Sequence, residues 1–246
     1  MSGRVYLGDK YISDVYTHIN EIRHEKHVDV LKKPVSRYVV DEDGVAKRIE
    51  FDFTGGFNEI TSISNYGLHE AFEYCTGITG SINFPKLTSV GERGLYYTFY
   101  GCTGITGSIN FPNLTSIGNY GLYYAFHSCT GITGSINFPN LTSVNTNGLY
   151  RTFHSCTGIN SVSFPKLTSI GNYGLYETFH SCTGITGSIN FPKLTSVGER
   201  GLYYAFYRCR EITELHFRAD AQSVVEAQFG YTAKFGATNA TVYFDL

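Results

Sequence analysis

The sequence predicts a β-rich α/β solenoid with short parallel β-strands and short helical convex segments, capped at both ends. The main observation is a repeat. The six cysteines, at positions 75, 102, 129, 156, 182 and 209, are 27, 27, 27, 26 and 27 residues apart. A phenylalanine three residues before each cysteine keeps the same spacing. A period of this length is typical of solenoids and repeat arrays, in which each unit buries one face on its neighbours.

The repeat divides the chain into three parts. We expect an N-terminal β-rich small domain or cap over 1–52, six repeats over 53–218 and a C-terminal cap over 219–246. The first part holds 9 of the 19 Lys and Arg residues and 10 of the 21 Asp and Glu residues. Turn sequences at Gly8-Asp9 and at 41–44 predict two hairpins there.

Each unit is predicted to contain one strand. Ser108, Ile109, Asn110 and Phe111 alternate between polar and apolar, and Pro112 ends the segment. Proline cannot donate to a strand ladder, so it suits this position. We therefore expect Ile109 and Phe111 to face the core and the two polar residues to face solvent.

A bend and a short helical piece are predicted upstream of this strand. Gly94 recurs in every unit, which indicates a turn that a Cβ atom would obstruct. Leu95, Phe99 and Cys102 follow at i, i+4 and i+7, the inward stripe of a short helix. The 26-residue unit lacks one residue just before Val162, so a small bulge should absorb the change there.

The C-terminal part should close the open end of the stack. It reads as a last strand, a helix near 221–229 and a closing strand over 240–244. A cap is needed because the end of a repeat array otherwise exposes unpaired strand edges.

Composition excludes several classes of function. The net charge of −2 argues against nucleic acid as the main partner. No apolar run reaches the roughly 18 residues of a membrane span. Met1 is not followed by a hydrophobic secretory segment. We find no phosphate-binding or dinucleotide-binding motif and no nucleophile elbow. The sequence therefore predicts no catalytic residues, no cofactor and no enzyme.

The cysteines are predicted to be free thiols rather than disulfides. Stacked equivalents would lie about 5 Å apart, but with parallel side-chain directions that do not suit a bridge. A buried thiol acting as a small hydrophobe is the simpler interpretation. The predicted structural ladder is Phe72, Cys75, Phe99, Cys102, Phe126, Cys129, Phe153, Cys156, Phe179, Cys182, Phe206 and Cys209.

The recurring His-Ser-Cys string of three units could suggest a metal site. His and Cys are two residues apart, which points their side chains away from each other on a helical turn. We therefore predict an exposed, partly stacked imidazole row and no metal. Neighbouring imidazoles about 5 Å apart should lower one another's pKa. The N-terminal His18, His24 and His27 lack a second ligand pair and are interpreted as a solvated segment.

Variation among the units predicts a binding surface. The strand positions barely change, whereas several positions on the bend and helical piece vary among Tyr, His, Asn and Arg. Such residues combine large contact area with polar groups. The alternative is drift of exposed positions after duplication. The candidate ligand-binding residues are Tyr97, Tyr100, Tyr120, Tyr124, His127, Arg151, His154, Tyr173, His180, Tyr204 and Tyr207.

The repeat resembles the BspA-like, or treponemal-type, bacterial leucine-rich repeats. The resemblance lies in F-x-x-C-x-x-I followed by I-x-F-P-x-L-T-S-[IV], here Phe126 to Ile132 and Ile136 to Val144, and covers roughly 59–218. The unit differs by an added Gly-Leu-Tyr segment before the Phe. The resemblance implies a leucine-rich repeat solenoid that is extracellular or at a cell surface.

These observations favour a non-enzymatic binding or adhesion protein that recognises a glycan or protein on a cell surface. The alternative is a structural spacer or assembly component, for example of a phage tail, where regularity itself is the function. Short segments at both ends are similar to parts of phage-tail and prophage-encoded proteins, so a virion location is also considered. The sequence indicates no oligomeric state.

Overall fold

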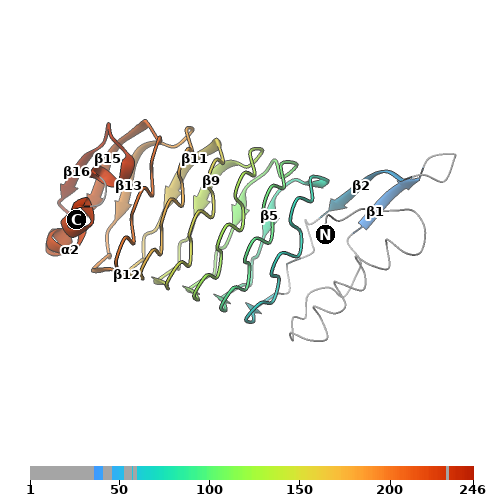
Figure 1. The fold of residues 1–246 in the computed structure, drawn as a ribbon, viewed down its shortest axis with the longest axis horizontal. Coiled ribbons are helices and arrows are strands. Elements are labelled where there is room, and N and C mark those ends of the chain that lie inside the picture. The colour runs from blue at the N-terminus through green and yellow to red at the C-terminus, as the bar shows by residue number, and fades with distance from the viewer. Residues whose placement is uncertain (1–35, 41–45, 53–56, 58–59, 231–232) are drawn as a thin grey trace.

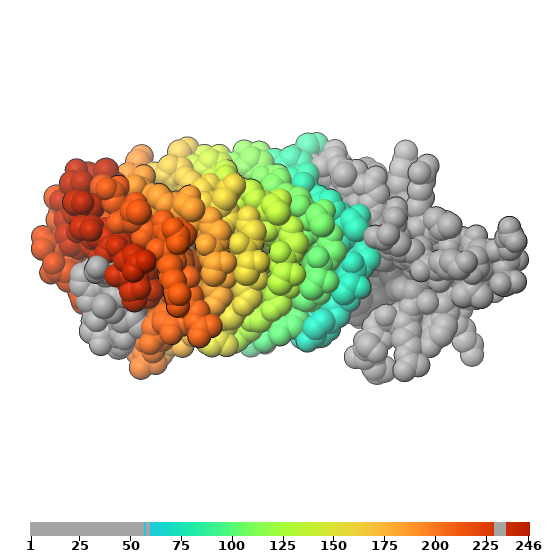
Figure 2. All heavy atoms as spheres, turned by 90° about the horizontal axis from the view of Figure 1, so that it is seen from above, coloured from blue at the N-terminus to red at the C-terminus, as the bar shows by residue number. Residues whose placement is uncertain are grey.

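The computed structural model describes residues 36–40, 46–52, 57, 60–230 and 233–246. Over this part the chain winds into a stack of similar coils, with the pair β1–β2 near one end and α2 at the other (Figure 1). The coils appear as parallel bands in the space-filling view (Figure 2). The predicted solenoid with short parallel strands is confirmed.

One side of the stack is a six-stranded parallel sheet in the order β14-β12-β10-β8-β6-β3. Each strand is a two-residue Ser-Ile or Ser-Val segment. All except β3 follow the recurring Phe-Pro-x-Leu-Thr string of their unit. The strands are β3 (Ser62–Ile63), β6 (Ser89–Val90), β8 (Ser116–Ile117), β10 (Ser143–Val144), β12 (Ser169–Ile170) and β14 (Ser196–Val197). This second strand per coil was missed by the sequence analysis, because two residues show no alternation to detect.

The predicted strand forms a second parallel row. The pair β5–β7 extends to β9 and β11, and β13-β15-β16 forms a further sheet. Ile109 and Phe111 are buried, as expected. The strands are β4 (Ile78–Thr79), β5 (Ile82–Asn83), β7 (Ile109–Asn110), β9 (Thr133–Asn137), β11 (Gly158–Ser163), β13 (Thr186–Phe191), β15 (Glu211–Phe217) and β16 (Thr241–Phe244).

The short unit is absorbed by an irregularity in this row. The register between β9 and β11 shifts between Ile159 and Ser161, just before Val162. The expected bulge is therefore present. A second shift, between Gly187 and Ser188 in the pair β13–β15, was not anticipated. Beyond each shift the inward residues realign, and Val162 stays buried.

The third side of each coil differs from the expected short helix. In the unit from Gly91 to Cys102, every second backbone N–H from Arg93 onward donates to a carbonyl of the next coil, at 2.7 to 3.0 Å. The intervening N–H groups donate to the carbonyl three residues back, at 3.1 to 3.3 Å. We call this stretch of consecutive turns a turn ribbon. The α-helix found in the described residues is α2 (Gln222–Glu226), in the C-terminal cap.

The turn ribbon repeats every four residues, which explains why it looked helical. Arg93, Tyr97 and Gly101 have φ values of 51°, 51° and 69°, so every fourth residue is left-handed. Leu95, Phe99 and Cys102 are fully buried, as the helical pattern required. Each turn of the ribbon buries two adjacent residues, 94–95 and then 98–99, with 102 next, so the buried set includes the i, i+4 and i+7 positions of a helix with period 3.6. Periodicity alone therefore could not separate the two.

The ribbon is stable only as part of the stack. Holding a residue other than glycine in the left-handed region costs roughly 1–2 kcal/mol. At Tyr97 the N–H donates to the Tyr123 carbonyl of the next coil, which contributes about 0.5–1.5 kcal/mol. The Tyr97 ring also stacks on Tyr124, worth about 0.5–1.5 kcal/mol more. Both contributions come from the neighbouring coil, so an isolated unit would not adopt this conformation.

Two columns of stacked phenylalanines fill the core. Strand phenylalanines lie 4.5 to 5.7 Å apart between ring centroids, and ribbon phenylalanines lie 5.0 to 5.7 Å apart. The columns meet edge to face, as at Phe111 and Phe126 with centroids 6.4 Å apart. The strand column is Phe57, Phe84, Phe111, Phe138, Phe164, Phe191 and Phe217. The ribbon column is Phe72, Phe99, Phe126, Phe153, Phe179 and Phe206.

The six cysteines are free thiols beside the ribbon column. Five are buried, and Cys75 is half-buried. Each buried thiol donates to a phenylalanine carbonyl of the preceding coil, as from Cys129 to Phe99 at 3.0 Å. Burial raises the pKa of Cys75 to about 11 and that of Cys209 to about 12. The ladder therefore links coils by weak hydrogen bonds and holds no ready nucleophile.

Gly94 sits where a side chain cannot fit. An added Cβ would lie 2.8 Å from Val90 Cγ1 and 3.0 Å from Ile63 Cγ2 of the preceding coil. Both atoms belong to buried residues of the six-stranded sheet. Glycine is therefore required at position 94, as expected, because a side chain there would collide with Val90 and Ile63 and not because the backbone is left-handed.

Added strands continue the stack at both ends. At the N-terminal end, β2 (Ala46–Asp52) pairs with β4 in parallel and with β1 (Ser36–Val40) in antiparallel fashion, at the place of the second expected hairpin. The hairpin expected near Gly8-Asp9 lies outside the described residues, as do His18, His24 and His27.

The C-terminal cap closes the opposite end. The strand β16 pairs with β15 in parallel, close to the predicted position of the closing strand. Between them lie η1 (Ala219–Ala221), α2, η2 (Ala227–Gly230) and η3 (Ala233–Gly236). The Phe206 N–H donates to the Phe235 carbonyl at 3.0 Å, as other ribbon residues donate to a following coil.

We predict that Phe138→Ala destabilises the protein by about 3–5 kcal/mol, because it removes a fully buried ring from the middle of the strand column. The free energy of unfolding in urea, followed by circular dichroism, measures the loss. Lys193→Ala, at an exposed position, should stay within about 0.5 kcal/mol of the parent. Equal stability of the two variants would contradict the stacked core.

We also predict slow alkylation of the native thiols at pH 8. Their raised pKa values leave little thiolate, and burial blocks access. Iodoacetamide followed by mass spectrometry should label Cys75 first and all six cysteines only after unfolding in guanidinium. Fast labelling of several cysteines in the folded chain would show that the ladder is open.

Candidate functional site

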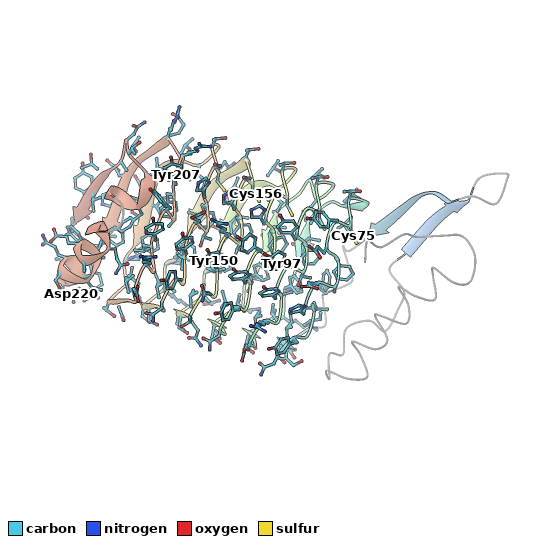
Figure 3. The ribbon with its side chains drawn as sticks, viewed as in Figure 1. Cys75, Tyr97, Tyr150, Cys156, Tyr207 and Asp220 are labelled. Carbon is cyan, nitrogen blue, oxygen red and sulfur yellow. The ribbon has the colours of Figure 1, made fainter. Side chains whose placement is uncertain are left out.

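The outward side chains of the turn ribbons form one continuous surface, which we call the aromatic face. Figure 3 shows Tyr97, Tyr150 and Tyr207 on it. Equivalent residues of successive coils lie above one another in columns, each named here by its member in the unit from Gly91 to Cys102. The Tyr96 column is His69, Tyr96, Tyr123, Tyr150, Tyr176 and Tyr203. The Tyr97 column is Glu70, Tyr97, Tyr124, Arg151, Glu177 and Tyr204. The Tyr100 column is Glu73, Tyr100, His127, His154, His180 and Tyr207. The Arg93 column is Tyr66, Arg93, Tyr120, Asn147, Tyr173 and Arg200.

The Tyr96 column is an unbroken stack. Successive ring centroids are 4.5 to 5.0 Å apart, and the planes differ by 1 to 18°. Inner rings such as Tyr123 and Tyr150 are therefore covered on both faces by their neighbours. Burial raises the pKa of Tyr123 and Tyr150, so their hydroxyl groups stay protonated at neutral pH.

In the Arg93 column, tyrosine alternates with arginine or asparagine. The guanidinium carbon of Arg93 lies 5.5 Å from the Tyr66 ring centroid and 5.3 Å from that of Tyr120. Its Nη1 also donates to the Tyr66 hydroxyl at 3.0 Å. Arg200 lies over Tyr173 at 5.9 Å. These cation–π contacts hold the arginines against the face.

The Tyr97 column changes chemistry in its middle. Tyr97 and Tyr124 stack at 4.8 Å, and Arg151 and Glu177 then replace tyrosine. Arg151 Nε donates to Glu177 Oε2 at 2.8 Å, and its Nη1 donates to the Tyr124 hydroxyl at 2.6 Å. Glu177 is only 7% exposed, so this pair offsets the cost of burying its carboxylate.

The three histidines lie stacked beside this pair. His127 and His154 have ring centroids 4.6 Å apart, and His154 and His180 are 4.3 Å apart with planes 8° from parallel. Tyr100 and Tyr207 continue the stack at its ends. The row is half-buried rather than exposed, which differs from the sequence-based expectation because tyrosine columns flank it.

Each imidazole of the row is oriented by the serine that follows it. The hydroxyl groups of Ser128, Ser155 and Ser181 lie 2.8, 2.8 and 2.9 Å from the Nδ1 atom of the preceding histidine. Each Nδ1 is therefore occupied by a local hydrogen bond, which leaves Nε2 available for other partners.

Burial lowers the pKa of these imidazoles, and neighbouring cations add to the effect. The pKa of His127 falls to about 4 and that of His154 to about 3. The pKa of His180 is also lowered, mainly by burial. The neighbouring imidazoles lower the pKa of His127 and His154, as expected, but burial has the larger effect. The row is neutral at physiological pH.

The candidate binding residues named from the sequence all lie on the aromatic face, and each is partly exposed. The sequence analysis left Glu177 out of that set, although it aligns with Tyr97 in the repeat. Glu177 lies beside the histidine row: its Oε2 is 3.9 Å from His154 Nε2. His154, Glu177 and His180 bring ligand atoms within 4.8 Å of one another, the one such group of three found among the described residues.

A separate polar cluster in the cap was not anticipated. His216 Nδ1 lies 2.9 Å from Asp245 Oδ1, and its Nε2 lies 3.3 Å from Glu214 Oε2. The hydrogen bond with Asp245 raises the pKa of His216. His216 and Asp245 are 29 residues apart, so no local pattern could have paired them. The contacts join β15 to the chain end and indicate a structural role.

Comparison with known proteins identifies the repeat. The sequence matches the family described as "BspA type Leucine rich repeat region" in six copies, over residues 61–199 and 150–239. The chain belongs to this family. The match extends beyond the predicted array into the C-terminal cap and ends between η3 and β16.

Solved leucine-rich repeat structures show similar chains at low identity. A leucine-rich repeat protein of *T. pallidum* is 19% identical, with a TM-score of 0.46 and 89% of this chain and 83% of that chain covered. A leucine-rich cell surface protein from *Faecalibacterium prausnitzii* A2-165 is 16% identical, with a TM-score of 0.27 and coverage of 76% and 64%. One from *Bacteroides ovatus* ATCC 8483 is also 16% identical, with a TM-score of 0.24 and coverage of 89% and 76%. A search of curated proteins returned no match.

As a BspA-type repeat protein, the chain belongs to a group of interaction and adhesion modules. Within the part of the chain that the structure describes, no helix has the length and apolar character to cross a bilayer.

We predict that the folded protein loses stability as pH falls from about 6.5 toward 4. The histidine row has folded pKa values below the ordinary value of about 6.5, so the unfolded chain binds more protons in this range. Urea midpoints at several pH values would measure the loss. Replacing His127, His154 and His180 by tyrosine, as at Tyr100 and Tyr207, should make it smaller. Three imidazoles that titrate near 6.5 by NMR in the folded chain would contradict this prediction.

Proposed function

We propose that this BspA-type repeat protein is a non-enzymatic recognition or adhesion protein, and that the aromatic face binds a protein ligand on a cell surface. The observation that carries the proposal is the stacking of the tyrosine columns. Rings held 4.5 to 5.0 Å apart by their neighbours have already lost their side-chain freedom. Binding to such a surface costs little additional conformational entropy.

The chemistry of the exposed atoms suits a protein partner. Ring edges and hydroxyl groups reach the surface, together with Arg93 and Arg200. Tyrosine and arginine are enriched at protein interfaces, where each combines apolar area with hydrogen bonding. Burial raises the pKa of Tyr97 and Tyr100, so both hydroxyl groups remain donors over the physiological range.

The same stacking argues against a glycan held by ring stacking. A sugar ring packs on an open aromatic face, and inner rings such as Tyr123 have both faces covered by other tyrosines. A glycan could use only the row of hydroxyl groups. We therefore favour a protein ligand over the glycan that the sequence analysis also allowed.

A non-enzymatic role is supported by the family and by the thiols. The buried cysteines have raised pKa values and lie in the core, and the three histidines of the row pair with serines within their own ribbon. The surface location that we propose rests on the family resemblance. The similar protein from *F. prausnitzii* is described as a cell surface protein.

The regular stack supports a second candidate, a structural spacer or assembly component such as part of a phage tail. Unbroken phenylalanine columns and inter-coil hydrogen bonds would make a stiff rod. In that role the differences among the coils on the aromatic face would have no effect on function. The two candidates differ in whether that face is needed.

The test is to replace Tyr97, Tyr124 and Tyr204 by alanine and measure binding to arrays of surface proteins and glycans. We expect at least tenfold weaker binding to any protein that the parent binds, because hot-spot tyrosines cost more than about 1.4 kcal/mol each. Thr88, Thr115 and Thr142, exposed beside the six-stranded sheet, provide the matched control when changed to alanine. Circular dichroism checks that both variants fold.

Loss of binding in the threonine variant alone would move the site to the sheet side of the stack. A parent that binds glycans but no protein would overturn the choice of ligand. A folded parent that binds nothing on either array would favour the spacer.

A further inference from the structure

The middle of the aromatic face carries histidine and carboxylate in place of tyrosine. In the Tyr100 column, histidine occupies three successive positions, with tyrosine on either side and Glu73 at the N-terminal end. The Tyr97 column holds two carboxylates, Glu70 at its N-terminal end and Glu177, which lies in the same coil as His180 and one coil after His154. Two imidazoles and a carboxylate therefore come together where His154, Glu177 and His180 meet, the one such group of three found among the described residues.

We propose that His154, Glu177 and His180 form a binding site for a divalent first-row metal ion, zinc in particular. Two imidazoles and one carboxylate are a ligand set that such ions use in proteins, with a further position open for water. Nothing in the repeat itself requires this combination, because tyrosine serves at the same column positions in other coils.

The orientation of the imidazoles supports the assignment. Ser155 and Ser181 occupy the Nδ1 atoms of His154 and His180 at 2.8 and 2.9 Å. With each serine accepting from Nδ1–H, the lone pair lies on Nε2. His154 Nε2 lies 3.9 Å from Glu177 Oε2. A hydrogen bond on the other ring nitrogen is the usual second-shell arrangement of a histidine ligand.

Charge and protonation also suit a cation. Burial lowers the pKa of both imidazoles, so protons do not compete for Nε2 at neutral pH. Glu177 is 7% exposed and lies against a single cation, Arg151, whose Nε is 2.8 Å from Oε2. The Arg151 side chain is 32% exposed, so it can turn toward solvent when the carboxylate takes another partner.

Small movements would complete the site. Ligand atoms of a tetrahedral zinc ion lie about 3.4 Å apart, given bonds of about 2.0–2.1 Å. The three groups now lie within 4.8 Å of one another, so the longest separation must close by up to about 1.4 Å. The rings of His154 and His180, 8° from parallel, must tilt toward each other to share one ion. Metal binding should thus disturb the stacked row and be visible in its NMR signals.

The experiment is a titration of the full chain with Zn²⁺ at pH 7.5 by isothermal titration calorimetry. His18, His24 and His27 are first changed to glutamine, because they could bind zinc themselves. We expect one ion per chain in this background. Glu177→Gln should weaken binding at least about tenfold, and His154→Tyr with His180→Tyr should abolish it. His127→Tyr, in the same column outside the group, should stay within about twofold.

The Arg151→Tyr variant distinguishes a metal site from a purely structural role of His154, Glu177 and His180, because only a metal site predicts tighter zinc binding. It installs the residue found at Tyr97 and Tyr124, removes the cation that competes for Glu177, and should tighten binding. Co²⁺ absorption in the visible range checks the ligand set independently, and circular dichroism checks the fold of each variant. No binding by the parent, or binding unchanged by Glu177→Gln and by the double histidine variant, would overturn the proposal.

Discussion

The hydrogen bonds between successive coils govern the rest of this structure. Along the strands and along every second residue of the turn ribbon, backbone N–H groups donate to the neighbouring coil at a repeat close to the ordinary spacing of β-strands. This places equivalent side chains about 5 Å apart. Phenylalanine then stacks on phenylalanine, and tyrosine on tyrosine, because the backbone brings them to ring-stacking distance. The left-handed residues of the ribbon are tolerated for the same reason, since the neighbouring coil supplies the contacts that offset their cost.

Because equivalent side chains of successive coils are in contact, a substitution in one coil changes the surroundings of the side chains in the adjacent coils. Arg151 would leave an unpaired cation among tyrosines if Glu177 did not follow it one coil later. The histidine row is neutral because the tyrosine columns shield it from water, and its neutrality in turn lets three imidazoles stack. The changes at the centre of the aromatic face therefore act as a set. Comparing the repeats one position at a time does not show that these changes depend on one another.

The aromatic face also limits what the protein can bind. Stacking makes the rings rigid and hides their faces, so recognition must use edges, hydroxyl groups and arginine. This favours a broad, flat protein surface over a small ligand in a pocket. A metal ion at His154, Glu177 and His180 would add one strong, localised contact to an otherwise uniform surface, and it would link two neighbouring coils.

The sequence by itself determined the solenoid, its six units, the inward phenylalanines and cysteines, and the surface on which the variable residues gather. A repeat makes these features visible in the sequence, since most positions that are buried in one coil are buried in the others. The turn ribbon, the second strand of each coil and the grouping of Glu177 with the histidines were decided only by the tertiary structure. A four-residue period resembles a helix over so short a stretch, a two-residue strand has no pattern of its own, and His154 and Glu177 are 23 residues apart. In each case the deciding interaction comes from the next coil, so no local segment of the chain contains it.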